Sequence, residues 1–298
     1  MAHVASGLRR FLLGLAKKAL VANTVADMAD AVWAQAGAGR TVPASLAWLA
    51  LVCYSLQIYY DFSGYSDMAV GIGRMLGFVF PENFLHPYAS RSVREFWRRW
   101  HVSLSSWFRD YLYIPLGGSR CGMARACLNG LVVFALCGLW HGASVTFLLW
   151  GLWHGLFLTV ERLAAGRRGR TNQPRSSILR AAAGHAYAVF VFVAGWLLFR
   201  SENATDFGAM LRSLAALAPA APETASLWLH VHPKLLLTIA LGTVFSLPVL
   251  PGIRARLARL APPDLRWILE SAAAAALGLV SLAFLAGGTY NPFLYFRF

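Results

Sequence analysis

Long apolar runs separated by short arginine-rich segments are the feature that most constrains how this chain can fold. Such runs cover residues 43–60, 64–80, 144–160, 181–199, 235–250 and 266–287. Helices of these lengths approach or match the thickness of the hydrocarbon core of a bilayer. Hydrophobic residues make up 58% of the sequence and charged residues 13%, which is more apolar than a water-soluble core requires. The sequence therefore predicts an all-α, polytopic helical integral membrane protein.

The basic residues flank the apolar runs and do not gather on one patch. Arginine is concentrated in residues 162–180 and 254–259, and the positive-inside rule places both segments in the cytoplasm, with residues 200–234 outside. A net charge of +14 distributed in this way indicates a lipid bilayer as the partner and argues against a nucleic acid. Residues 1–18 are expected to form a basic amphipathic helix at the membrane surface, and no cleavable signal peptide is evident.

Several of the expected helices are short or broken. Residues 61–64 read as a polar hinge between two runs, so Asp61 and Asp67 are expected to face protein or water. Residues 81–120 contain six arginines among many aromatic residues, which suits an interfacial or re-entrant helix. No internal repeat is visible. We therefore expect one membrane-embedded domain over residues 1–298.

A Trp-His-Gly repeat places His141 and His154 in apolar surroundings. The run 127–139 that precedes His141 would be about 20 Å long as a helix, too short to cross, so His141 is expected inside the membrane. Two interpretations of His141 have similar weight: a catalytic base, and a buried histidine bonded to a neighbouring helix. Gly142 lets backbone or substrate approach closely, which favours the catalytic base. His154 would lie about 220° around a continuous helix. It is expected to serve packing or hydrogen bonding.

His101 would lie on the seam between an aromatic face and an arginine stripe if residues 81–120 form a helix. The guanidinium groups could hold an anionic or sugar-like substrate or a carrier phosphate, but a histidine that reaches water at the interface is slightly preferred. Metal chemistry is poorly supported, because no ligand-like spacing of cysteine or carboxylate accompanies the histidines. No serine lies in a nucleophile elbow, and the four cysteines are expected to be packing residues. Of the mechanisms considered, the one that remains is general-base catalysis, in which a positioned histidine accepts a proton from a substrate hydroxyl.

Several segments, in this order, resemble the membrane-bound O-acyltransferase (MBOAT) family. They are GLRRFLLGLAKKALVAN, YYDFSGYSDMAVGIGRMLGF, REFWRRWHVSLSSWFRDYLYIPLGG, LWHGASVTFLLWGLWHG and the terminal NPFLYFRF. The likeness is greatest to the bacterial branch that contains the alginate O-acetyltransferase membrane subunit. The resemblance covers a core at residues 7–165. The C-terminal spans at 181–298 resemble the family mainly in their hydropathy.

The resemblance implies a function and a site. His141 corresponds to the family's catalytic histidine and His101, in an Arg-Trp-His motif, to a second active-site position. Short, broken and re-entrant helices would surround a central pore, through which an acyl group, most often acetyl, passes from a cytoplasmic donor to hydroxyls of an exported polysaccharide such as alginate. The residues expected to support the histidines are Trp100, Arg98, Asp110, Asp61, Tyr65 and Trp140.

The same resemblance implies the surroundings of the reaction. No bound cofactor is expected, because the donor, acetyl-CoA or an acyl carrier, is a co-substrate. An extracytoplasmic acetyltransferase is the expected partner protein, and the bacterial cytoplasmic (inner) membrane is the expected location.

Two other interpretations stay open on the sequence. Members of this branch carry further N-terminal spans before the Gly-Leu-x-x-Phe segment, and this chain begins almost at that segment, so an inactive truncated paralogue is one alternative. A proton-coupled transporter is the other, because intramembrane histidines and aspartates can relay protons. Inverted repeats would support the transporter, and none is found.

Overall fold

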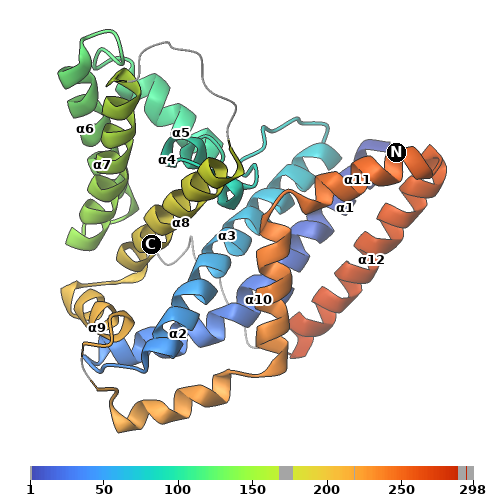
Figure 1. The fold of residues 1–298 in the computed structure, drawn as a ribbon. Coiled ribbons are helices and arrows are strands. Elements are labelled where there is room, and N and C mark those ends of the chain that lie inside the picture. The colour runs from blue at the N-terminus through green and yellow to red at the C-terminus, as the bar shows by residue number, and fades with distance from the viewer. Residues whose placement is uncertain (1, 168–176, 218, 288–292, 294–298) are drawn as a thin grey trace. The chain divides into compact units, whose positions relative to one another are not determined.

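The computed structural model describes residues 2–167, 177–217, 219–287 and 293. Throughout this described part, all regular structure is helical, which confirms the predicted fold class (Figure 1). Within the expected single domain, the residues form two compact units. Unit 1 comprises residues 1–32, 52–83 and 225–298, and unit 2 comprises residues 33–51 and 84–224.

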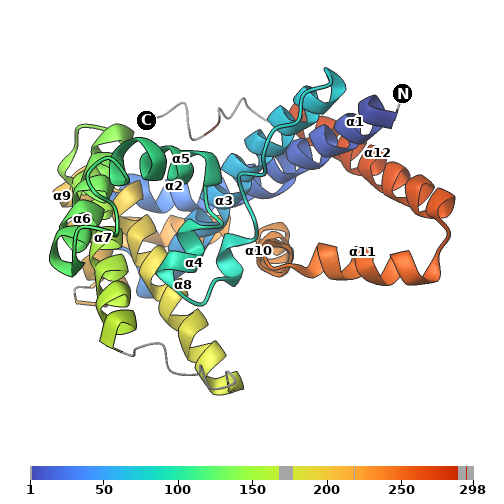
Figure 2. The ribbon, with the colours of Figure 1, turned by 90° about the horizontal axis from the view of Figure 1, so that it is seen from above.

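Unit 1 is built from helices at the two ends of the chain. They are α1 (Ala2–Ala16), a π-helical turn (Lys17–Ala22), the first part of α2 (Asn23–Gly37), the second part of α3 (Ala44–Met75), α10 (Pro233–Ser246), α11 (Val249–Leu260) and α12 (Pro263–Gly287). Helix α1 lies beside α12 in both ribbon views (Figures 1 and 2). Helix α2, which the sequence interpretation did not include, follows the π turn without a break.

The hinge expected at residues 61–64 is wrong, because α3 continues through it as one helix of 32 residues. The glycine in this stretch serves close packing. A Cβ atom on Gly64 would lie 2.8 Å from the carbonyl oxygen of Gly14, and one on Gly71 would lie 2.7 Å from that of Gly7. The two glycine pairs therefore let α1 and α3 approach backbone to backbone, and the polar residues between them are satisfied by α1.

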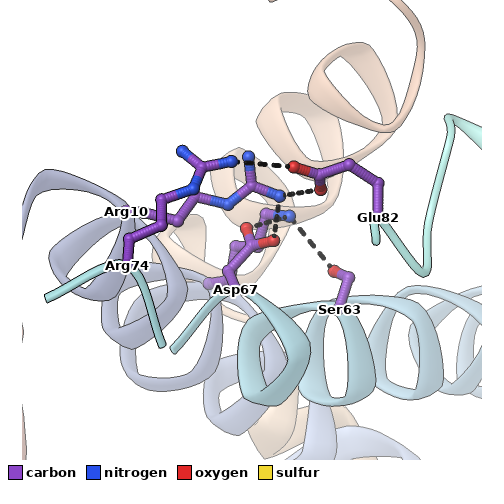
Figure 3. A network of polar contacts seen from close by, with 6 residues as sticks. Arg10, Ser63, Asp67, Arg74 and Glu82 are labelled. Carbon is purple, nitrogen blue, oxygen red and sulfur yellow. Dashed lines mark hydrogen bonds and ion pairs between the residues drawn. The ribbon is translucent and has the colours of Figure 1, made fainter. Parts of the chain in front are cut away.

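Ion pairs connect α1 and the π turn to α3 (Figure 3). The Asp67 carboxylate accepts from Arg10 and from Lys17, each at 2.8 Å. Arg10 also binds Glu82, which accepts from Arg74 at 3.2 Å. Residues 1–18 include a helix, as expected, and these basic side chains are paired with acidic residues of unit 1. The position of this helix at the membrane surface stays a prediction. One buried pair, between Lys18 and Asp61, adds to this network.

Unit 2 contains two short helices and a long helical hairpin. The helices are α4 (Val93–Trp97), α5 (Val102–Phe108) with a π turn (Arg109–Tyr113), α6 (Met123–His141), α7 (Val145–Arg167), α8 (Ile178–Arg200) and α9 (Ala204–Leu214). Helices α6 and α7 lie side by side (Figures 1 and 2). A Cβ atom on Gly138 or Gly151 would lie 2.2 or 2.1 Å from a carbonyl oxygen of the other helix, so these glycines set the close packing of the hairpin.

Residues 81–120 do not form the continuous helix on which the expected seam was based. Helix α4 begins at Ser92, whose side chain accepts from the Glu95 N–H, and its first N–H groups, of Val93 and Arg94, donate to the carboxylate of Glu161. Such carboxylate capping favours a helix start. The helix ends after five residues, and α5 starts anew at Val102.

Among the described residues, three helices, α6, α8 and α12, are long and apolar enough to cross a membrane. A fourth span is formed if residues 222–230 and α10, which meet at a bend of 68°, count as one. The helices of the expected spans at 43–60, 64–80 and 144–160 are not among them. Helix α6 has 19 residues, about 28 Å, so the expectation of a helix too short to cross is corrected. Most of the expected cytoplasmic loop and tail, at 168–176 and 294–298, lies outside the described residues.

Candidate functional site

His101 lies in the turn between α4 and α5. Its backbone is left-handed, with φ 43° and ψ 58°, a conformation that costs a non-glycine residue about 1–2 kcal/mol. The His101 carbonyl accepts the first helical bond of α5, from the Ser105 N–H at 3.0 Å. The imidazole stacks on Phe84 at 6.5 Å between ring centroids, and its Nδ1 lies 3.4 Å from the Ser103 hydroxyl. Burial lowers the pKa of this imidazole to about 4, so the ring is neutral at physiological pH.

His141 is the last residue of α6, in the turn that leads to α7. Its ring lies edge to face against Trp150 and Phe199, with centroids 5.2 and 5.0 Å away, and against Trp140 at 4.9 Å. Gly142 follows, where a Cβ atom would lie 2.7 Å from the Phe147 ring. The glycine therefore permits the tight turn that holds the imidazole in an aromatic surrounding.

The two histidines come from different elements of unit 2, and an aromatic cluster connects these elements. Trp100, which precedes His101, lies 4.9 Å from Trp196 between ring centroids, and Trp196 lies 6.5 Å from Trp150, which contacts His141. The packing of α4 against α7 and α8 holds the His101 turn next to the hairpin that carries His141. An imidazole in a turn and an imidazole at a helix end can exchange protons with a hydroxyl and hold an oxygen atom.

The other predicted site residues are dispersed. Trp100 is buried in the core of unit 2, where its ring lies 4.9 Å from Trp196. Trp140 contacts His141 but is 51% exposed. Arg98 is exposed on the rim of a pocket, and Asp110 is exposed and paired with the neighbouring Arg109 at 2.7 Å.

Two predicted residues belong to unit 1. Asp61 is buried and binds Lys18, and Tyr65 lies edge to face against Phe293 at 5.7 Å. Asp61 and Tyr65 therefore make these contacts within unit 1, whereas the two histidines belong to unit 2.

His154 is completely buried, which agrees with the packing role expected from the sequence. It stacks on Phe96 and meets Trp97 and Trp150 edge to face, at 5.1 and 5.3 Å. Both ring nitrogens lack a hydrogen-bond partner among the described residues. His141 and His154 lie on two helices, so the rotation about one helix does not apply, and they contact the same Trp150 ring.

A pocket of about 430 Å³ lies between the α4–α5 segment and the α6–α7 hairpin. Four arginines line it: Arg94, Arg98, Arg109 and Arg162. The sequence interpretation noted the first three as a polar stripe and missed the fourth. Cys127 and Cys137 of α6 also line the pocket, whereas the sequence interpretation gave the cysteines only a packing role.

Comparison with known proteins was decisive for the family. A family model described as membrane-bound O-acyltransferase, MBOAT, matches residues 2–200, which include both histidines and the pocket. The chain belongs to this family. With this match and its apolar helices, the chain is a multi-pass membrane protein.

Individual relatives in this family are O-acyl and D-alanyl transferases by name. A probable alginate O-acetylase AlgI of Pseudomonas syringae pv. tomato is 45% identical over 205 residues, which are 68% of this chain and 37% of that protein. A peptidoglycan O-acetyltransferase of Helicobacter pylori is 35% identical over 217 residues, 72% of this chain and 40% of that protein. A teichoic acid D-alanyltransferase of Bacillus subtilis is 38% identical over 96 residues, 30% of this chain and 24% of that protein. The chain spans about two fifths of the length of the first two relatives.

Proposed function

We propose that this protein transfers an acetyl group to hydroxyls of an exported polysaccharide, as the names of its MBOAT relatives suggest. The observation that carries the proposal is the placement of His141 and the His101 turn around one aromatic cluster of unit 2, within the residues that match the family model. The names of the relatives describe acyl transfer, which favours this function over the transporter considered from the sequence.

In the proposed reaction, His141 acts as the base. Its imidazole accepts the proton of the polysaccharide hydroxyl while the hydroxyl oxygen forms a bond to the carbonyl carbon of the acetyl thioester. The carbon–sulfur bond of the donor breaks, and the leaving thiolate takes the proton from the imidazolium. The products are an acetyl ester on the glycan and a free thiol. His101 is the second polar group, which would bind a substrate oxygen beside the base.

Support for these roles comes from the surroundings of each ring. The aromatic side chains around His141 partly cover its ring and bring no carboxylate into contact with it among the described residues, so the ring is suited to shuttle a proton rather than to hold a permanent charge. The donor is a soluble co-substrate in this proposal, and no bound cofactor is needed for the step.

The setting of the reaction is part of the same proposal. The membrane would be the bacterial cytoplasmic (inner) membrane, where an exported glycan passes on the outer side. An extracytoplasmic acetyltransferase is the partner protein that we propose for this chain.

The experiment compares the two histidines of the Trp-His-Gly repeat. In a strain from which the gene has been deleted, we expect the wild-type chain to restore acetyl esters on the exported polymer and the His141→Phe chain to restore none. His154→Phe is the matched control, because that ring packs against aromatic side chains and its two nitrogens have no hydrogen-bond partner among the described residues, and it should retain acetylation. Immunoblotting of membranes checks that all three chains accumulate.

Two results would contradict the proposal. Acetyl esters at the wild-type level with His141→Phe would remove this residue from the reaction. Absence of esters with an accumulated wild-type chain would remove the proposed activity itself.

A further inference from the structure

Helix α11 of unit 1 joins two candidate membrane spans. The bent pair of residues 222–230 and α10 comes before it, and the long apolar helix α12 begins shortly after it ends. The 12 residues of α11 measure about 18 Å along the helix axis, much less than the hydrocarbon core of about 30 Å. Because α11 is too short to cross the membrane, it belongs on one side of it, next to the ends of both spans.

One face of α11 is apolar and uncovered. Its side chains recur at intervals of three or four residues, which places them together on the helix surface: Leu250, Ile253, Leu257 and Leu260. None of the residues of α11 is buried, and Leu250, Ile253 and Leu260 are 44%, 45% and 74% exposed. Figure 2 shows α11 well away from α1 and α3. The described part of unit 1 therefore leaves this apolar face without a cover.

Three arginines surround the apolar face. On a helical wheel Arg254 and Arg256 lie about 80° to either side of its centre, and Arg259 lies about 140° from that centre. Arg254 is paired with Glu270 of α12 at 3.3 Å, whereas Arg256 and Arg259 form no ion pair with the described residues. Long basic side chains in such positions can reach lipid headgroups while the apolar side chains enter the acyl chains.

The start of α12 has the residues of a membrane interface. Trp267, in the second turn of α12, is about half exposed, and the guanidinium carbon of Arg9 lies 5.7 Å from the centroid of its ring. Tryptophan is enriched at the level of the headgroups, where its ring is apolar and its N–H reaches water. Only a short turn separates α12 from α11, so Trp267 indicates the same level for α11.

We propose that α11 lies flat in the bilayer interface and binds anionic phospholipids. Its apolar face enters the acyl chains, and Arg256 and Arg259 bind the negatively charged headgroups. Charge complementarity favours this occupant over a protein, because a helix with an apolar face and basic borders matches acyl chains beneath anionic headgroups. Helix α11 lies outside residues 2–200, which match the family model, and the inference does not depend on the proposed function.

Quenching by brominated lipids measures which face of α11 enters the bilayer. A bimane label is attached to Ile253→Cys, near the centre of the apolar face, or to Ala255→Cys, about 180° from that centre. The full-length chain carries Cys121→Ser and Cys127→Ser, since the other two cysteines are buried. It is reconstituted in nanodiscs of phosphatidylcholine with brominated acyl chains, and the chain without an introduced cysteine gives the background. We expect a loss of fluorescence at position 253 and not at position 255.

A titration with two brominated lipids tests the choice of headgroup. With the label at position 253, we expect half-maximal quenching at an about fivefold lower mole fraction of brominated phosphatidylglycerol than of brominated phosphatidylcholine, the factor that one basic residue near an anionic surface provides. Arg256→Gln/Arg259→Gln should abolish this preference, and Arg256→Lys/Arg259→Lys should keep most of it because the charge stays. The matched control Arg120→Gln/Arg125→Gln removes the same charge from two exposed arginines of unit 2 and should keep the preference.

Each other outcome would overturn the proposal. Quenching at neither position means that protein, such as a second copy of this chain, covers the apolar face, and equal or stronger quenching at position 255 means that this face does not enter the lipid. Equal half-maximal fractions of the two lipids, or a preference that persists in Arg256→Gln/Arg259→Gln, would exclude binding of anionic headgroups by these arginines. Neither measurement needs turnover, so failure of the proposed acetylation would leave the result for α11 unchanged.

Discussion

The buried ion pair between Lys18 and Asp61 should respond in opposite ways to single and to double substitution. The two side chains are 8% and 2% exposed, so both charges have lost most of their hydration. In Asp61→Asn the ammonium stays buried and loses its counter-charge, which costs about 3–5 kcal/mol of unfolding free energy for a pair of this kind. In Lys18→Met/Asp61→Leu both charges disappear, and we expect a stability equal to the wild type or higher by about 1–4 kcal/mol.

The assay is reversible unfolding in one detergent, followed by the fluorescence of the 11 tryptophans, on the wild type, both single variants and the double variant. Asp110→Asn is the control, because the pair between Arg109 and Asp110 is exposed and water solvates both groups. It should leave the midpoint unchanged. A double variant as unstable as the sum of the two single variants would refute the reasoning, because the pair itself would then stabilise the fold.

Two further predictions concern packing and pH. Gly14→Leu should lower the unfolding midpoint, because a Cβ atom there would lie 2.5 Å from the Gly64 carbonyl oxygen. Gly252→Ala, where a Cβ atom would meet nothing within 4 Å, should leave the midpoint unchanged or raise it slightly. An equal decrease of the midpoint in both variants would contradict the close α1–α3 contact. The pKa of His101, lowered to about 4, means that the unfolded chain binds this proton more readily, so stability should fall as pH drops from about 6.5 to about 4. An unchanged pH dependence of the midpoint in His101→Gln would contradict this.

The helical class and most helix positions were predictable, because apolar runs of sufficient length leave few alternatives in a membrane. The continuity of α3 through residues 61–64 was not predictable. Asp61 and Gly64 have the composition of a chain break, and what keeps the helix intact is remote in sequence: Lys18 for the charge and Gly14 for the close approach. Local propensity contains no information about such partners.

The candidate site shows a similar division. The residues alone singled out His141, but the role of His101 came from the family resemblance. Histidine is enriched among the non-glycine residues that adopt a left-handed backbone, but only a few per cent of non-glycine residues adopt it, so the residue type alone did not predict the turn. The wall of the arginine pocket on α6 was not predicted, because Cys127 and Cys137 were interpreted only as packing residues. Arg162 lines the pocket because of the way α7 packs against α6 and the α4–α5 segment, and the sequence of α7 alone does not predict that packing.

The division of the chain into two units has a consequence for the order in which it is made. Unit 2 lies within residues 33–224, whereas α1 of unit 1 has partners on α3 and on α12, for example Ser271, whose hydroxyl accepts from Arg9 at 3.4 Å. At translation rates of about 5–20 residues per second, the 74 residues that follow Thr224 take on the order of 4–15 s. During that interval α12, with which α1 packs, is still being made, while unit 2 already has all its residues. Unit 1 therefore completes its packing after unit 2, and membrane proteases that degrade incompletely folded chains would act on unit 1.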